Sequence, residues 1–289
     1  MRFFISDVFA DSRYSGNQLA TFLDCAGLSR KEMQAIAREV NFSETTFVLS
    51  DEEKDGGYEV RIFTPKSELP FAGHPTLGTA FVIRNEVIRR KVKRVVLRLG
   101  VGDVPVTFAG DGLAWMRQPR PEFGRAYDAK PVARMLSLNE DEIDPDFPIL
   151  EVSTGVPFLI VPLCSRVSLG RIKVDAECMS GLLSNAWAQA PLVFAKGGQE
   201  KGQDLSVRVF PILHGITEDA ATGSGNGCLA AYLSRTKYLG SEKVDAIVGQ
   251  GYELGRPSTL HLRASPMKAG IKVEVGGKVQ KVAEGTWPA

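Results

Sequence analysis

The strongest constraint on the fold is a pattern that the chain carries twice. Arg61-Ile62-Phe63 leads through a polar connection into the glycine-containing segment 71–83, and Arg208-Val209-Phe210 leads in the same way into segment 218–233. Each pattern is typical of a short strand, a tight turn and an apolar helix. A helix that is apolar nearly all round is expected to be buried. The sequence therefore predicts two halves of like architecture, a two-fold internal repeat and not a long array.

Residues upstream of each pattern extend the similarity. Ser29 and Glu32 form a capping box for a helix over 30–40, and Asp175 opens a matching amphipathic helix in the second half. The strands expected after these helices cover residues 45–49 and 191–195. Many strands around one or two helices in each half indicate an α+β fold class.

A length of 289 residues favours two domains. The proline-rich, polar segment 118–124 is the best linker candidate, so we expect an N-terminal domain over 1–124 and a C-terminal domain over 125–278. The last strands, near 279–289, could cross back to the first domain. A further helix is expected over 241–254, and Gly276-Gly277 is expected to be a hairpin turn in a closing β-meander.

Composition argues against several function classes. Lys plus Arg number 35 and Asp plus Glu number 34, which gives a net charge of +1, so no nucleic-acid partner and no membrane partner is expected. One basic cluster, residues 89–94, is better explained as the solvated start of a strand. No apolar run is long enough to span a bilayer, and no signal-peptide layout is present. We expect a cytoplasmic protein.

Cysteine and histidine spacing argues against a metal site. The four cysteines are scattered without a CxxC pair, and the three histidines have no close ligand partners in sequence. Reduced, mostly buried thiols are expected. No metal and no cofactor is predicted.

The two glycine-containing helix starts are candidate ligand sites. A helix N-terminus presents unpaired N–H groups and a partial positive charge, which favour a bound anion, and glycines allow close approach of the backbone. Gly73 in the first half and Gly223, Ser224 and Gly225 in the second are therefore predicted to bind substrate. A plain capped loop is the simpler alternative.

Four side chains could carry chemistry. Glu44 lies at the head of an apolar strand, where burial would raise a carboxyl pKa and suit it to proton transfer; the alternative is a solvated glutamate at a strand end. Asp219 could be a second acid or base, or a turn cap. His74 could donate a proton, or cap its helix with Pro75 in the first helical position. Ser224 could bind a carboxylate or act as a nucleophile, although no Gly-x-Ser-x-Gly elbow is present.

Several segments resemble the phenazine-biosynthesis PhzF-like isomerase family. They are Asp7-Val8-Phe9 with Gly16-Asn17, segment 41–47 around Glu44, Arg61-Ile62-Phe63-Thr64-Pro65, segment 69–78 with Gly73-His74-Pro75, Ser153-Thr154-Gly155, Glu218-Asp219 with Ala221-Thr222-Gly223-Ser224, and Gln250-Gly251 with Gly255-Arg256-Pro257-Ser258. The resemblance covers nearly the whole chain. It implies the diaminopimelate-epimerase-like fold, in which two similar domains, each a β-barrel-like sheet around a central helix, hold the site between them.

The resemblance also implies roles for individual residues. In the family, the residue matching Glu44 is the proton-shuttling base. The residues matching His74, Asp219 and, more loosely, Ser224 lie in the site. Gly73 matches a position whose backbone contacts the substrate. Members are usually homodimers. The implied activity is a cofactor-independent isomerisation of a small carboxylate-bearing metabolite.

The chain also departs from the family pattern. Ala220 replaces a common proline, and Gly225-Asn226-Gly227 is closer to the epimerase and proline-racemase cousins. Those cousins use two cysteines as opposed bases, whereas this chain has Ala72 and Ser224 at the matching positions, so the two-thiol mechanism is not available. An amino-acid or hydroxy-acid epimerase and a non-catalytic metabolite-binding protein are the alternatives.

Overall fold

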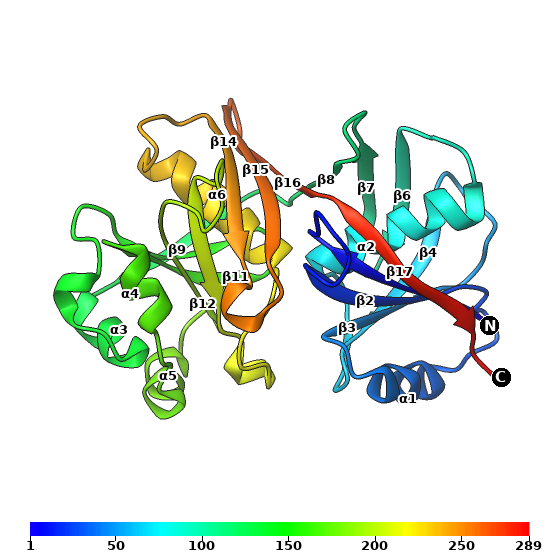
Figure 1. Ribbon diagram of the computed structural model, residues 1–289, viewed down its shortest axis with the longest axis horizontal. Coiled ribbons are helices and arrows are strands. Elements are labelled where there is room, and N and C mark those ends of the chain that lie inside the picture. Colours follow the sequence, from blue (N-terminus) through cyan, green and yellow to red (C-terminus); the bar gives the residue numbers. More distant parts are fainter. Residues whose placement is uncertain (289) are drawn as a thin grey trace. The chain divides into compact units, whose positions relative to one another are not determined.

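The computed structural model describes residues 1–288, which form two compact units (Figure 1). Unit 1 comprises Met1–Arg117 together with the residues from Gly276 onward, and unit 2 comprises Gln118–Val275. Strand β16 (Gly270–Gly277) spans the boundary. Both units combine a strongly mixed β-sheet with helices, which confirms the predicted α+β class.

Unit 1 has one sheet and two α-helices. Its strands are β1 (Arg2–Val8), β2 (Asn17–Phe22), β3 (Glu44–Val48), β4 (Tyr58–Phe63), β5 (Glu68–Leu69), β6 (Arg94–Leu99), β7 (Gly102–Phe108), β8 (Ala114–Arg117) and β17 (Val279–Thr286). Its helices are α1 (Arg30–Val40) and α2 (Gly73–Val82), and α2 continues into a π-helical turn, Ile83–Ile88. Antiparallel pairs join β17 to β1, β1 to β2, β3 to β4, β6 to β7 and β7 to β8, whereas β2 with β3 and β4 with β6 are parallel.

Unit 2 repeats this arrangement. Its strands are β9 (Glu122–Tyr127), β10 (Ile149–Ser153), β11 (Pro157–Leu163), β12 (Pro191–Lys196), β13 (Leu205–Val209), β14 (Val244–Gln250) and β15 (Ser258–Met267). Its helices are α3 (Ala129–Leu136), α4 (Arg166–Arg171), α5 (Ala176–Leu183) and α6 (Gly223–Thr236), with short 3₁₀ turns at Glu140–Glu142, Ile212–His214 and Tyr252–Leu254. From β10 to β15 the successive pairs are antiparallel, parallel, antiparallel, parallel and antiparallel, the same order as from β1 through β2, β3, β4 and β6 to β7. The predicted internal repeat is therefore confirmed in the strand topology.

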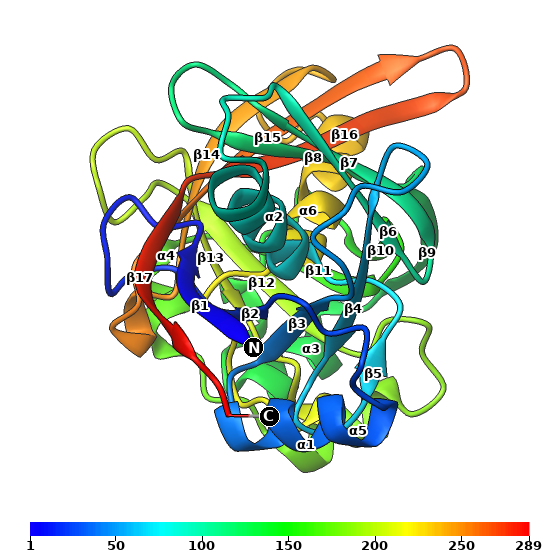
Figure 2. The same ribbon diagram turned by 90° about the vertical axis from the view of Figure 1, so that its right-hand side faces the viewer.

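Each unit wraps its sheet around one central helix. In unit 1, α2 contacts β1, β2, β3, β6, β7, β8 and β17 (Figure 2), and every residue from Gly73 to Ala80 is buried. In unit 2, α6 contacts β10, β11, β14 and β15, and it is buried from Gly223 to Ser234. Small residues make this possible. A Cβ at Gly78, for example, would lie 2.5 Å from Leu19 and 2.8 Å from Val8, so only glycine lets α2 approach the strands this closely.

The other face of the sheet carries a second apolar layer. In unit 1 the predicted capping box of α1 is present, with Ser29 accepting from the Glu32 N–H, and Met33 packs against Phe22 and Phe47, whose rings stack 5.3 Å apart. Burial of each such ring stabilises the fold by roughly 2–3 kcal/mol. In unit 2, α4 contacts β11 and β12, and residues of α3, α4 and α5 join residues of these strands in one apolar cluster. Strands buried on both faces explain the nearly unbroken apolar runs in the sequence.

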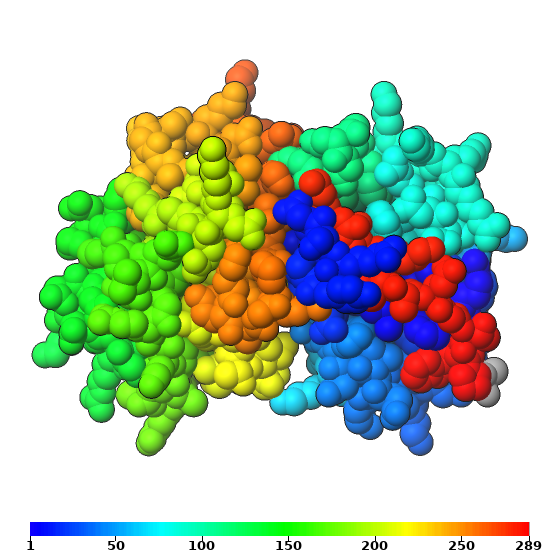
Figure 3. All heavy atoms as spheres, viewed as in Figure 1, coloured from blue at the N-terminus to red at the C-terminus, as the bar shows by residue number. Residues whose placement is uncertain are grey.

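The C-terminal strand completes unit 1. Residues of β17 pair with β1 along its whole length, from Arg2 opposite Thr286 to Val8 opposite Val279, and the N-terminal ammonium group donates to the carbonyl of Trp287 over 2.9 Å. Figure 3 shows atoms of the first strands, in blue, and of β17, in red, lying side by side on the surface of this unit.

Two local predictions were wrong. Segment 241–254 forms strand β14 and a 3₁₀ turn, because Val244, Ala246 and Val248 are buried with a period of two while Asp245 between them is exposed. The predicted linker 118–124 begins at the boundary between the units, and its last residues already belong to β9, which pairs with β10. Gly276 and Gly277 do not form a hairpin turn but lie within β16. A Cβ at Gly276 would lie 2.6 Å from the ring of Trp115, and a Cβ at Gly277 would lie 2.3 Å from the ring of Phe9.

Among the described residues, no helix combines the length and the apolar character needed to cross a bilayer.

Candidate active site

In unit 1 the fold brings Glu44 and His74 together. Glu44 is the first residue of β3, and His74 is the second residue of α2. The Nε2 atom of His74 lies 3.4 Å from Oε2 of Glu44, and their side chains are only 5% and 14% exposed. Two residues that the sequence singled out separately, 30 positions apart, therefore face each other.

The surroundings of His74 keep its imidazole neutral. Burial removes water that would solvate an imidazolium ion, which lowers the pKa of His74 from 6.5 to about 3, while a hydrogen bond with the backbone of Gln18 acts in the opposite direction. Nδ2 of Asn17 lies 3.3 Å from Nδ1 of His74. At neutral pH the Glu44–His74 contact is thus a contact between a carboxyl group and an uncharged ring, not an ion pair.

His74 is not the helix cap, contrary to one of the predictions. The N-cap is Ala72, α2 begins at Gly73, and Pro75 is the third helical residue, still within the first turn where its missing N–H costs nothing. The hydroxyl of Thr76 donates to the Ala72 carbonyl over 2.7 Å. Because no capping bond occupies His74, its side chain faces Glu44.

In unit 2 the glycine-rich segment lies inside a helix and not in a loop before it. Thr222 is the N-cap, so Gly223, Ser224 and Gly225 form the first turn of α6. A Cβ at Gly225 would lie 3.1 Å from Leu192 and 3.2 Å from Thr222. Close packing, and not positive φ, explains this glycine. The first turn presents backbone N–H groups and the positive end of the helix dipole, the features that bind an anion.

A buried amide organises the segment before α6. Gln250 on β14 is 1% exposed. Its Nε2 donates to the Asp219 carbonyl over 2.8 Å, and its Oε1 accepts from the Thr222 N–H over 3.2 Å and from Nδ2 of Asn226 over 2.9 Å. The hydroxyl of Thr222 donates to Oδ2 of Asp219 over 2.6 Å. Asp219 is therefore held by its carboxylate to Thr222 and by its backbone carbonyl to Gln250.

Gly251 and Ser258 support the same segment. Gly251 has a φ of +79°, and a Cβ there would lie 2.5 Å from the carbonyl oxygen of Ala220. The hydroxyl of Ser258 donates to that carbonyl over 2.9 Å. The roles of Gln250, Gly251 and Ser258 were not predicted from the sequence, although all three belong to segments that carry the family resemblance, which was the one available signal.

The thiol of Cys228, on the second turn of α6, is unsuited to proton abstraction. Burial raises its pKa to about 12, and its sulfur lies 3.6 Å from Thr154 Oγ1 and 3.4 Å from the Val156 carbonyl. A thiolate base would need a lowered pKa. Within residues 1–288 no group of three or more His, Cys, Asp or Glu side chains is arranged to hold a metal ion.

The fold has two similar α+β units, each with a buried helix at its centre. At the start of one of these helices a carboxylate faces a histidine. These features define a class of protein, the isomerases and epimerases of the diaminopimelate-epimerase-like fold. The family model described as "Phenazine biosynthesis-like protein" matches residues 6–285. The chain belongs to this family, and it is an enzyme of this isomerase family.

Individual relatives agree with the assignment. The trans-2,3-dihydro-3-hydroxyanthranilate isomerase of Pseudomonas aeruginosa is 35% identical over 292 residues, covering 98% of each chain. Among solved structures, the phenazine biosynthesis protein of Bacillus anthracis, PhzF family, superposes with a TM-score of 0.89 at 25% identity, covering 98% of this chain and 97% of that one. A predicted epimerase from Pseudomonas aeruginosa gives 0.81 at 33% identity, covering 100% and 99%.

A more distant likeness shows the fold alone. A probable proline racemase from Agrobacterium radiobacter superposes with a TM-score of 0.60 at 10% identity, over 99% of this chain and 92% of that one.

Proposed function

We propose that this protein is a cofactor-independent isomerase that moves a proton on a small carboxylate-bearing metabolite, with Glu44 as the shuttling base. The observation that carries the proposal is the placement of Glu44 against a buried, neutral His74 in a chain that belongs to the phenazine biosynthesis-like family. A group that removes a proton and returns it elsewhere needs a defined geometry next to the reacting carbon and protection from bulk water. The low exposure of both side chains supplies that protection.

The proposed reaction has two proton transfers. Glu44, as a carboxylate, takes a proton from an activated carbon and becomes a carboxylic acid, while the electron pair of the broken C–H bond moves into the conjugated system of the substrate. Glu44 then returns the proton to a different carbon, so the enzyme ends in its starting state. Neutral His74 can donate a hydrogen bond to the intermediate without carrying a charge.

Gly73 and the first turn of α6 supply anion-binding chemistry. Backbone N–H groups at a helix start stabilise a carboxylate or the negative charge that develops during proton abstraction. We assign this role to Gly73 in unit 1 and to Gly223, Ser224 and Gly225 in unit 2, and an assisting acid–base role to Asp219.

The proposed substrate class follows from the relatives. Trans-2,3-dihydro-3-hydroxyanthranilate, named for the Pseudomonas aeruginosa relative, is the first compound to test, followed by a screen of small cyclic and branched carboxylates. An epimerase is the second candidate, favoured by the 33% identical structure described as a predicted epimerase, but the buried thiol of Cys228 argues against the two-thiol form of that reaction.

The test is solvent-proton exchange in deuterium oxide. The purified protein is incubated with each compound, and deuterium uptake is followed by mass spectrometry and NMR. Isomerisation shifts the double bonds, and it places deuterium at the new carbon to the extent that the protonated Glu44 exchanges with solvent before it returns the proton, whereas epimerisation places deuterium at the original stereocentre. Stoichiometric binding with neither product formation nor exchange for every compound would favour the binding-protein alternative. Activity that persists after dialysis against a chelator, in protein whose absorption spectrum shows no bound organic chromophore, supports independence from a cofactor.

Assembly is proposed as a homodimer of two 31.4 kDa chains. Sedimentation at high protein concentration that gives only a monomer would contradict it.

A further inference from the structure

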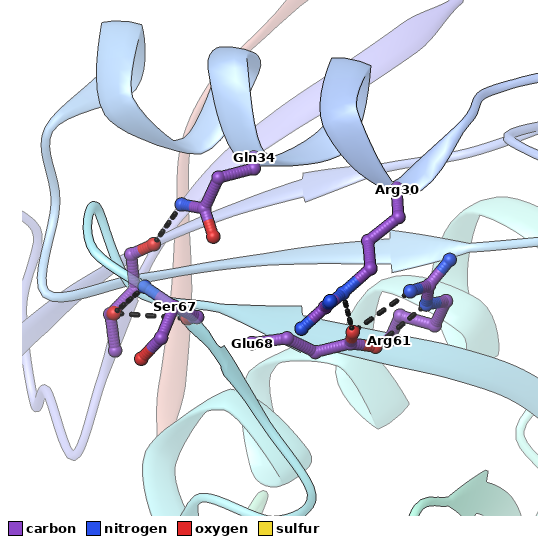
Figure 4. A network of polar contacts seen from close by, with 6 residues as sticks. Arg30, Gln34, Arg61, Ser67 and Glu68 are labelled. Carbon is purple, nitrogen blue, oxygen red and sulfur yellow. Dashed lines mark hydrogen bonds and ion pairs between the residues drawn. The ribbon is translucent and has the colours of Figure 1, made fainter.

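Two bidentate ion pairs occupy equivalent positions in the two units. In unit 1, Nε and Nη2 of Arg61 bind the two carboxylate oxygens of Glu68 over 2.7 and 2.8 Å (Figure 4). In unit 2, Nε and Nη2 of Arg208 bind the two oxygens of Glu218 over 2.9 and 2.7 Å. Each arginine uses the same edge of its guanidinium group, which gives the pair a defined orientation.

The chain positions of the two pairs match as well. Both arginines lie on equivalent strands of the repeat, Arg61 on β4 and Arg208 on β13. Glu68 begins the short strand β5, and each glutamate stands five positions before the first residue of its central helix. The guanidinium carbon of Arg61 lies 5.2 Å from the ring centre of Phe63, and that of Arg208 lies 4.9 Å from that of Phe210. These aromatic contacts hold the two arginines in one orientation.

The two pairs differ in their exposure to water. Arg61 and Glu68 are 27% and 25% exposed, and both line a cavity of about 460 Å³. A second arginine, Arg30, also binds Glu68 over 2.7 Å. Arg208 and Glu218 are only 9% and 8% exposed, and Nη1 of Arg208 donates to the carbonyl of Leu169 over 3.0 Å.

Each pair ties a strand to the segment that leads into a central helix. Asp219 directly follows Glu218, and its backbone N–H donates to the Val209 carbonyl over 3.0 Å, next to Arg208. Gly73 and His74 follow Glu68 through a short connection. A charge-assisted, two-point contact restricts such a segment more than a single bond does, because both translation and rotation of the carboxylate are limited.

We propose that the two pairs are matched positioning devices: Arg208–Glu218 sets the conformation of the segment that carries Asp219, and Arg61–Glu68 sets the segment that carries Gly73 and His74. The catalytic meaning of this assignment rests on the proposed function of those residues. The conformational part rests only on the contacts within each unit.

The test is hydrogen exchange of the whole protein, read by mass spectrometry in peptides that cover 216–227 and 66–77. Arg208→Lys keeps the charge but removes the two-point contact, and Arg61→Lys is the matched change in unit 1. Arg98→Lys is the control, because Arg98 forms a more exposed ion pair with Asp103 on β6 and β7.

The positioning role predicts reciprocal, local effects. Exchange in 216–227 should rise about tenfold in Arg208→Lys while 66–77 stays at the wild-type rate, and Arg61→Lys should do the reverse. Arg98→Lys should change neither peptide. Unchanged exchange in both variants would overturn the proposal, because it would show that the ion pairs do not restrain their segments. An equal rise in both peptides in either variant would also overturn it, because that result would show only general destabilisation.

An activity measurement adds the catalytic part. With a substrate from the deuterium screen, Arg208→Lys should lower kcat about tenfold with KM nearly unchanged, because Asp219 would be displaced without loss of the binding groups. A rise in KM alone would contradict the role assigned to Asp219. If the wild-type enzyme turns over no compound, the proposed function fails, but the exchange experiment still decides whether the pairs position their segments.

Discussion

Nε2 of His74 lies 3.4 Å from Oε2 of Glu44, and burial lowers the pKa of the histidine to about 3. A protonated ring at this distance would hold Glu44 in an ion pair and make it a weaker base. The neutral ring leaves the carboxylate able to accept a proton. The depth of His74 in the fold is therefore as important to the proposed chemistry as its identity.

The first prediction concerns Glu44. Glu44→Gln keeps the shape of the side chain but cannot accept a proton, so we expect solvent-deuterium exchange into substrate to fall by at least about a thousandfold, with ligand affinity retained. Glu44→Asp should also be poor, because its carboxylate is withdrawn by one methylene. Thermal unfolding of both variants serves as the folding control.

His74→Ala separates the two candidate bases. If His74 assists, this variant should lose less activity than Glu44→Gln. Wild-type exchange in Glu44→Gln would transfer the role of base to His74 or Asp219 and end the mechanism proposed for Glu44.

The second prediction concerns pH and stability. Below pH 6.5 the unfolded His74 takes up a proton that the folded residue, with a pKa of about 3, does not bind. The contribution of His74 to the free energy of unfolding is therefore fully present above pH 6.5. Below pH 6.5 it falls by about 1.4 kcal/mol per pH unit. In urea unfolding between pH 7 and pH 4.5, His74→Gln should show a shallower decline than the wild type. If the wild type and His74→Gln lose stability in parallel, the His74 ring takes up its proton at the same pH in the folded as in the unfolded protein, and the lowered pKa is contradicted.

The third prediction compares two glycines with the same backbone conformation. Gly251 and Gly240 have φ values of +79° and +80°, but a Cβ at Gly251 would lie 2.4 Å from the Arg256 carbonyl oxygen, whereas nothing lies within 4 Å at Gly240. Gly240→Ala should cost about 1–2 kcal/mol of unfolding free energy from its backbone strain alone. Gly251→Ala should cost at least about 2 kcal/mol more, because backbone atoms must move. If both variants lose the same unfolding free energy in urea, the close packing of Gly251 against the carbonyl oxygens of Arg256 and Ala220 is contradicted.

The fourth prediction concerns the buried ion pair. Arg208→Met leaves Glu218, which is 8% exposed, without its guanidinium partner, and a buried charge left alone typically costs about 3–5 kcal/mol. Arg98→Met removes a more exposed partner and should cost no more than about 1 kcal/mol. The midpoints of urea unfolding measure both. The double variant Arg208→Met/Glu218→Leu should recover much of the loss, since neither charge is then buried.

Local and periodic signals in the sequence predicted much of the fold. The capping box at Ser29 and Glu32 located α1, and the continuous apolar character of 228–233 predicted a buried helix. The same approach failed at 244–250, where a run of only seven residues fits both a strand and part of a helix, and the parallel pairing with β13 decides between them.

The candidate site was predicted less completely. Residue type and neighbours singled out Glu44 and His74, but only the packing of α2 against β3 brings them to 3.4 Å. The cap was misplaced because Ala72 caps α2 with its backbone alone, which leaves no side-chain signal. The contacts of Gln250 with Thr222 and Asp219 span 28 and 31 positions, and such long-range partners are not visible in local sequence.

The pairing of β17 with β1 has a consequence for the order of events during synthesis. Unit 2 is one continuous stretch of chain, Gln118–Val275, so it has been synthesised completely before residue 280 is added. Unit 1 begins earlier but is completed later, because this edge of β1 stays open until β17 has been made and can pair with it. An unpaired edge invites association with other chains. The newborn protein therefore carries an incomplete first half throughout the synthesis of its second, and the pairing of β17 with β1 ends that vulnerable period.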